Sequence, residues 1–188
     1  FNGAPPLLYV GVDVAKLQPT REQRFLVARE LLALWSGNTL VRGFDARGLA
    51  SLLTAIGRSV DRAFPLLGEP SDLESLTKRV GGALSRKSRA ALAEPVAALA
   101  ANARSLDLAA YLQAAPLSEA RAGLLLSGAF DAAVRILAKE AAKPLASETA
   151  KLAATIESDP RLADLVGYAL SDDHFQARQA LRLAIDAL

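Results

Sequence analysis

Helix-start signals recur along the whole chain, and this pattern limits its fold more than any other sequence feature. Asp45, Ser85 and Ser171 each precede a segment rich in Ala and Leu, and Asp159 is followed by Pro160. A Ser or Asp side chain at such a position caps a free backbone N–H of the first helical turn, and proline suits the first helical position. The sequence therefore predicts a mainly α fold of about nine helices.

The predicted helices end at Gly, Pro or Ser-rich turns. Pro95 predicts a kink or a break near Glu94, and Pro116 is expected to close the helix before it. A short apolar segment, LLYVGV at 7–12, is the one predicted strand. The helices are expected at 20–35, 46–64, from a Ser71–Glu74 capping box to 83, from 85 past Pro95, 105–114, 118–126, 131–142, 147–157, 160–170 and 172–187, with one helical turn within 12–17.

Composition excludes several kinds of site. The chain has 188 residues and no Cys, which excludes disulfides, thiol catalysis and Cys-ligated zinc. Its net charge of +2 is scattered, so we expect no nucleic-acid partner. No apolar run is long enough to span a membrane. We expect a single domain over 1–188 with a soft joint near 65–71, and no cofactor, because no glycine-rich phosphate or dinucleotide loop is present.

The residue usage also bears on the source. Arg outnumbers Lys by 16 to 6, and 39 residues are Ala, which suggests a bacterium with a GC-rich genome. The chain begins at Phe1 and contains no Met, so we expect a fragment of a longer bacterial polypeptide. The bacterial cytoplasm is the favoured compartment, and the periplasm is the alternative. The oligomeric state cannot be inferred from the sequence.

The segment FLVARELLALW, 25–35, is an apolar helix interrupted by adjacent charges at Arg29 and Glu30. Three interpretations are open. The two residues form a solvent-exposed edge of the helix, since neighbours on a helix differ by about 100°. They line a cleft that binds without chemistry. Alternatively, Arg29 is a structural residue paired with Glu30 or Glu119, since an unpaired buried charge is costly.

Two stretches together resemble one enzyme family. A strand, a turn and a capped helix are predicted for the first stretch, LLYVGVDVAKLQPTREQRFLVARELLAL. A second helix is predicted for the other stretch, LSEARAGLLLSGAFDAAVRIL at 117–137, where Arg121, Gly123, Gly128 and Asp131 are in register with the family pattern. This order resembles the gluzincin metallopeptidases related to the CAAX-prenyl and periplasmic quality-control proteases. Their first helix carries H-E-x-x-H and their second a carboxylate ligand. The resemblance implies a zincin-like core.

The metal ligands of that family are replaced here. The resemblance places Arg29 and Ala33 at the two His positions, Glu30 at the general base and Pro116 at the third ligand. Ala120 stands where the family has Asp, and a shifted register brings Glu119 near the missing ligand. His174 is the only His, so no His pair exists to hold zinc.

We therefore expect no metal and no catalysis. The resemblance implies a pseudo-peptidase domain that acts as a structural or protein-interaction module, bound to a protein partner or to other domains of the same polypeptide. Two alternatives stay open: an all-α adaptor or repeat-type scaffold unrelated to peptidases, and a metal-independent hydrolase that uses Glu30.

Overall fold

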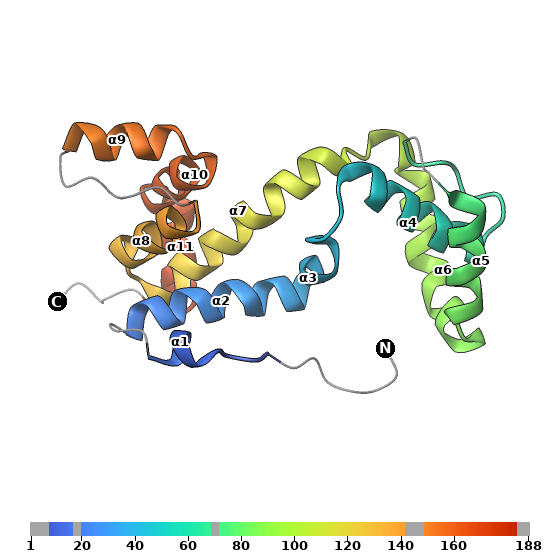
Figure 1. The fold of residues 1–188 in the computed structure, drawn as a ribbon, viewed down its shortest axis with the longest axis horizontal. Helices are drawn as coiled ribbons and strands as arrows, with labels where there is room; N and C mark the ends of the chain where they lie inside the picture. Colours follow the sequence, from blue (N-terminus) through green and yellow to red (C-terminus); the bar gives the residue numbers. More distant parts are fainter. Residues whose placement is uncertain (1–7, 17–19, 69–71, 142–148, 184–188) are drawn as a thin grey trace. The chain divides into compact units, whose positions relative to one another are not determined.

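The computed structural model of the chain describes residues 8–16, 20–68, 72–141 and 149–183. Over these ranges the chain forms α-helices, one 3-10 helix and no strand (Figure 1), so the predicted mainly α fold is confirmed. The helices are α1 (Val12–Ala15), α2 (Thr20–Ser36), α3 (Asn38–Val41), α4 (Ala46–Val60), α5 (Leu73–Ala83), α6 (Arg86–Ala101), η1 (Ala103–Ser105), α7 (Leu108–Ser127), α8 (Phe130–Glu140), α9 (Thr149–Glu157), α10 (Pro160–Ala169) and α11 (Asp172–Ala180).

The helices gather into two compact units. The first unit consists of Phe1–Thr39 and Ala114–Leu188, and the second unit of Leu40–Gln113. Residues 65–68 of the predicted soft joint lie inside the second unit, and 69–71 fall outside the described residues. A single domain would unfold as one cooperative unit, so the expectation of one domain over 1–188 stays a prediction.

Four of the predicted helix starts are confirmed by capping hydrogen bonds. In each, the side chain of the predicted cap accepts a hydrogen bond from a backbone N–H of the first turn, which would otherwise lack a helical partner. Ser71 of the predicted Ser71–Glu74 capping box lies outside the described residues. The N-cap residue of α5 is Asp72, which has a left-handed φ of 48° and makes no side-chain cap. The confirmed pairs are Asp45 with Gly48 at 2.7 Å, Ser85 with Ser88 at 3.0 Å, Asp159 with Arg161 at 2.9 Å and Ser171 with His174 at 3.3 Å.

The predicted strand at 7–12 is wrong for the residues that the structure describes. Residues 8–11 are irregular, and Val12 begins α1. Because no other described segment is a strand, these residues have no partner with which to form a ladder, and β propensity without a partner does not make a strand. The small β element and the strand beside the 20–36 helix are therefore absent from this part of the chain.

Pro95 and Pro116 both lie inside helices, so the predicted helix end at Pro116 and the predicted break near Glu94 are wrong, and the alternative of a kink near Glu94 stays a prediction. The expected helices at 105–114 and 118–126 are one helix, α7, with Pro116 inside it, and α6 continues through Pro95. Proline removes one backbone hydrogen bond, but residues on the C-terminal side of Pro116 are buried. Their burial favours a continuous helix, which presents Ala120 and Leu124 to the core of the first unit.

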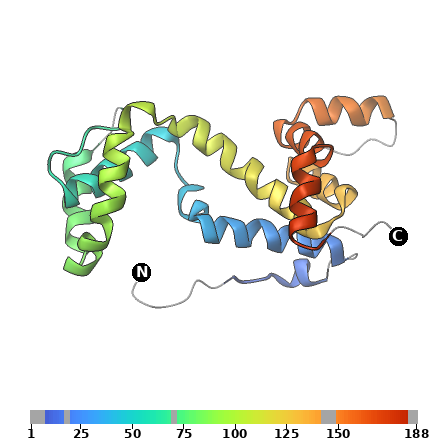
Figure 2. The same cartoon turned by 180° about the vertical axis from the view of Figure 1, so that it is seen from behind.

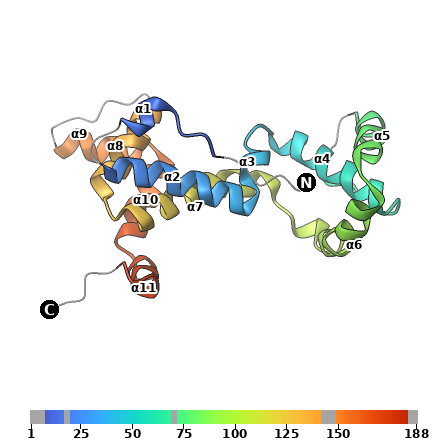
Figure 3. The same ribbon diagram turned by 90° about the horizontal axis from the view of Figure 1, so that it is seen from below.

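The core of the first unit lies among α2, α8, α10 and the part of α7 that begins at residue 114. Figures 1 and 3 show α2 beside this part of α7, and Figure 2, from behind, shows α11 in front of the other helices of the unit. The apolar side chains of this core come from all four helices: Phe25, Ala120, Leu124, Ala133, Val134, Ile136, Leu137, Leu162 and Leu165.

In the second unit α4 packs against α5 and α6, and the buried core lies between α4, α6 and the segment after α4. Phe64 and Leu67, on the segment after α4, fold back onto Ala50 and Val96. The backbone N–H of Leu67 donates to Oγ1 of the fully buried Thr54 at 3.1 Å, which satisfies both groups away from water. Among the described helices, none is long and apolar enough to cross a membrane.

Candidate functional site

The six positions that the peptidase resemblance singled out lie on two helices of the chain. Arg29, Glu30 and Ala33 are on α2, and Pro116, Glu119 and Ala120 are on α7. Ala33 is fully buried, and Glu119 and Ala120 are 2% and 1% exposed; Arg29, Glu30 and Pro116 are half-buried. These positions therefore belong largely to the interior of the first unit.

The two helices approach each other closely at Gly123. A Cβ added at this glycine would lie 2.8 Å from the ring of Phe25 and 2.9 Å from Cγ of Arg29, both on α2. Phe25 and Ala120 also share one core. The structure thus brings the Arg29 region of α2 against the α7 segment that follows Glu119, and the contact depends on the absence of a side chain at position 123.

Arg29 is held in an ion pair that the sequence did not indicate. Its Nη1 donates to Oε1 of Glu140, the last residue of α8, at 2.7 Å, and its side chain is only 12% exposed. The guanidinium also lies over the ring of Phe25, with Cζ 5.5 Å from the centroid. The interpretation of Arg29 as a structural residue that needs a partner is supported, but the partner observed is Glu140.

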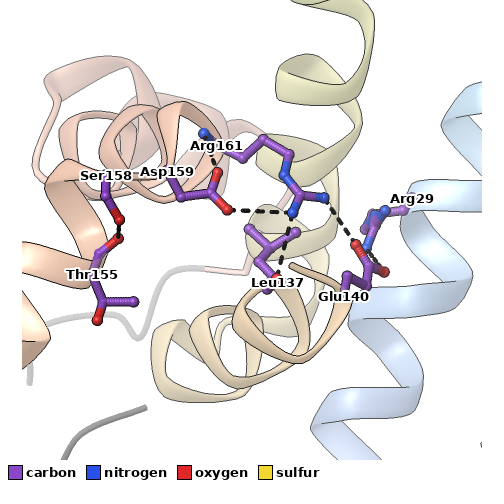
Figure 4. A network of polar contacts seen from close by, with 7 residues as sticks. All are labelled: Arg29, Leu137, Glu140, Thr155, Ser158, Asp159 and Arg161. Atoms are coloured by element: carbon purple, nitrogen blue, oxygen red, sulfur yellow. Dashed lines mark hydrogen bonds and ion pairs between the residues drawn. The ribbon is translucent and has the colours of Figure 1, made fainter. Parts of the chain in front are cut away.

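Glu140 is shared between two arginines (Figure 4). Its Oε2 accepts from Nη1 of Arg161 on α10 at 3.1 Å. Arg161 also donates to the carbonyl of Leu137, at 3.4 Å, near the C-terminal end of α8. A second carboxylate, Asp159, pairs with Arg161 at 3.4 Å while its Oδ1 caps α10. The network of Arg29, Glu140, Arg161 and Asp159 thus ties α2, α8 and α10 together.

One sequence signal could have identified Glu140. A carboxylate in the last turn of a helix faces the negative end of the helix dipole, which is unfavourable unless cations lie nearby. Glu140 ends α8 in this way, and two arginines compensate it. The unfavourable position predicts that a basic partner exists, but it cannot show which of the 16 arginines supplies it.

A second polar cluster lies where α7 meets α10. Nε of Arg121 donates to Oδ2 of Asp164 at 2.9 Å, and a second guanidinium nitrogen bonds the other carboxylate oxygen. The hydrogen bond from Arg121 to Asp164 raises the pKa of the guanidinium, although burial opposes it. Burial raises the pKa of Tyr168, which lies beneath Arg121 and beside His174. The geometry is a stacked ion pair that joins helices.

The described residues contain no group of three His, Cys, Asp or Glu side chains that could hold a metal ion. The ring of His174 lies against that of Tyr168, with centroids 5.1 Å apart and ring planes tilted by 58°, and its backbone N–H completes the Ser171 cap. Comparison with known protein families, with curated proteins and with solved structures finds no match. What the chain does must therefore be inferred from its own residues.

Replacing Glu140 by glutamine should lower the free energy of unfolding by about 1 kcal/mol, because Arg29 and Arg161 then lose their shared countercharge while the side-chain shape is kept. Urea unfolding followed by circular dichroism measures this. Glu157, which is exposed at the end of α9, provides the matched control, and Glu157→Gln should change stability by less than about 0.5 kcal/mol. Equal effects in the two variants would show that the network does not stabilise the fold.

Proposed function

We propose that this chain is a non-catalytic helical module that binds another protein through one exposed face of α2. The observation that carries this proposal is the exposure of Trp35, which is 86% exposed, one turn after Leu31, which is 50% exposed. Single exposed apolar residues are common on protein surfaces. A leucine at i and a tryptophan at i+4 differ from such single residues, because they lie on the same side of a helix and form one continuous apolar strip.

Tryptophan is the residue type most enriched at the centres of protein interfaces, where a buried ring contributes a large apolar area at little cost in conformational entropy. Trp35 is the only tryptophan in the chain. Leaving its ring in water forgoes roughly 2 kcal/mol or more of burial free energy, which a partner can recover. Leu31 and Trp35 are therefore the contact residues that we assign.

The charges on this face indicate what the partner presents. At 100° per residue, Arg24, Leu31 and Trp35 lie within about 40° of one another around α2, and Arg24 is about 16 Å along the axis from Trp35. Arg24 and Arg21 are exposed, so this face is cationic beside its apolar strip. The matching surface is an apolar groove with a carboxylate at one end.

Two facts support the absence of catalysis at the positions that the resemblance named. Arg29 is committed to Glu140, and Ala33 and Ala120 are packed into the core of the first unit. Neither alanine offers a group that could act on a substrate. These positions serve packing and helix association, which is a structural role.

Peptidase descent is a separate proposal. The approach of α2 to α7 at Gly123 supports it, because the two zinc helices of a gluzincin also meet. The lack of a strand beside α2 in the described residues favours the other origin, an all-α adaptor unrelated to peptidases. The interaction function does not depend on which origin holds.

The function is tested with a photocrosslinking amino acid at position 35, compared with the same residue at position 175. Phe175 is the matched site, an exposed aromatic on α11 of the same unit. A protein that crosslinks only from position 35 is then purified and bound to the wild-type chain. We expect a shift of Trp35 emission to shorter wavelength on binding, because the ring leaves water.

The reconstituted complex decides between a specific and an incidental contact. Trp35→Ala should weaken binding by about 30-fold or more, the effect of a hot spot of about 2 kcal/mol. Arg24→Glu, made separately, should also weaken binding, because it places a negative charge opposite the carboxylate of the partner. Phe175→Ala should leave affinity unchanged. If position 35 yields no adduct of its own, or if the alanine variants bind alike, the proposal is wrong.

The competing hypothesis of a hydrolase that uses Glu30 is tested on the same protein. We expect no stoichiometric zinc by metal analysis, and no difference between wild type and Glu30→Gln on generic peptide and ester substrates. Bound zinc at one ion per chain, or an activity that Glu30→Gln abolishes, would replace the non-catalytic function with an enzymatic one.

A further inference from the structure

A cavity of about 540 Å³ opens on the second unit. Its wall is formed by the first turns of α4, by Leu67 and Gly68, and by the segment from η1 to the start of α7. Cavities of this size accommodate small organic molecules or the end of a peptide. No feature of the α2 face contributes to it, so it requires its own explanation.

The floor of the cavity is apolar. Ala50 and Leu67 line it and are each 3% exposed, as members of the core of the second unit. Gly68 has a φ of +61°, and a Cβ placed there would face the Cβ of Ala50 at 3.8 Å. The glycine therefore lets the chain turn without placing a side chain into the space beside Ala50, which helps to keep the cavity open.

The charged lining of the cavity is predominantly basic. Arg47 on α4 and Arg104 on η1 both line it, and the one acidic lining residue is Asp107. Oδ1 of Asp107 accepts the backbone N–H of Ala110 at 2.9 Å and so caps α7. Ser105 donates to the carbonyl of Asn102 at 2.9 Å. Arg47 and Arg104 are thus the two cationic side chains of the lining, and they give it a net positive charge.

We infer that this cavity binds an apolar molecule that carries a single carboxylate, held by Arg47 and Arg104. The lining carries two positive charges and one negative charge, a balance that suits a monoanion better than a dianion such as phosphate. Guanidinium groups bind carboxylates through paired charge-assisted hydrogen bonds, and the floor of Ala50 and Leu67 takes the apolar body. Two sources share this chemistry: a free short-chain carboxylic acid, and the C-terminus of a peptide that ends in an apolar residue.

The probes are hexanoate, N-acetyl-Leu-Leu with a free carboxylate, the same dipeptide as its amide, and inorganic phosphate. Each is titrated into the whole chain and followed by ¹H–¹⁵N NMR. We expect the carboxylates to shift the amides of residues 46–50 and 104–109, and the amide and phosphate to bind at least about 10-fold more weakly. The tighter of the two carboxylates identifies the source.

Arg47→Glu and Arg104→Glu should each weaken carboxylate binding by about 10-fold or more, and Arg62→Glu is the matched control. All three arginines are exposed, and Arg62 lies in the same unit outside the cavity lining. A glutamate at 47 also suits the first turn of α4, so lost binding does not reflect a lost helix. The inference is overturned if neither carboxylate binds at about 10 mM, a concentration at which weak fragments still bind. It is also overturned if the amide binds as tightly as the carboxylates, or if Arg62→Glu weakens carboxylate binding as much as Arg104→Glu does.

Discussion

Replacing Gly57 by alanine is expected to destabilise the second unit by about 2–3 kcal/mol. Gly57 is buried in α4, and a Cβ there would lie 2.7 Å from Cδ2 of Phe64 and closer still to two other ring atoms. Phe64 is 1% exposed, so its ring is enclosed by the core and cannot turn out into solvent without losing its burial. Helix propensity alone predicts the opposite sign, a gain of about 0.5–1 kcal/mol. The steric effect is larger and should determine the result.

Gly82 provides the matched control for this prediction. It lies in α5 of the same unit, and nothing lies within 4 Å of a Cβ placed there. Gly82→Ala should therefore show the propensity effect alone and raise stability by about 0.5 kcal/mol. Urea unfolding followed by circular dichroism measures both variants. If Gly57→Ala were neutral or stabilising, the close packing of Phe64 on α4 would be incorrect.

Local chemistry made part of this fold predictable. Asp45, Ser85, Asp159 and Ser171 fix helix starts because each cap needs only its own first turn. The C-terminal ends of the helices are predicted less accurately. The sequence predicts that α4 reaches residue 64, but it ends at Val60, because the chain folds back there and places Phe64 on the core. Where a helix ends depends on what the following residues pack against, and the sequence does not contain that contact explicitly.

Tertiary contacts account for the other differences. The segment 8–12 has apolar and β-branched residues, but a strand also needs a neighbouring strand, which the described residues do not supply. At the candidate site, the need of Arg29 for a partner was predictable from the cost of burying a charge. The identity of that partner was not, since Glu140 lies 111 residues away in the chain.

Replacing Phe25 by alanine should cost the first unit about 3–5 kcal/mol, the largest effect expected of any substitution considered. Phe25 is fully buried, and its ring fills the space between α2 and α7 at Gly123. Removing the ring loses the burial free energy and leaves a cavity that the four surrounding helices cannot close fully. Phe175→Ala is the control. This phenylalanine on α11 is 58% exposed, so the same chemical change there should cost less than about 1 kcal/mol.

Hydrogen exchange of the Phe25→Ala variant also distinguishes one cooperative domain from two. If the two units unfold separately, amides of α2, α8 and α10 should lose protection while those of α4 and α6 keep theirs, since only the first unit loses a core side chain. If the chain is the single domain that the sequence predicted, protection should fall equally in both units, because both then open only through global unfolding. Equal stability of Phe25→Ala and Phe175→Ala would contradict the core assignment itself. A loss of protection confined to the first unit would show that the carboxylate cavity and the Trp35 face belong to separately folding parts of the chain. Each of the two could then be tested in a protein whose other unit has been destabilised.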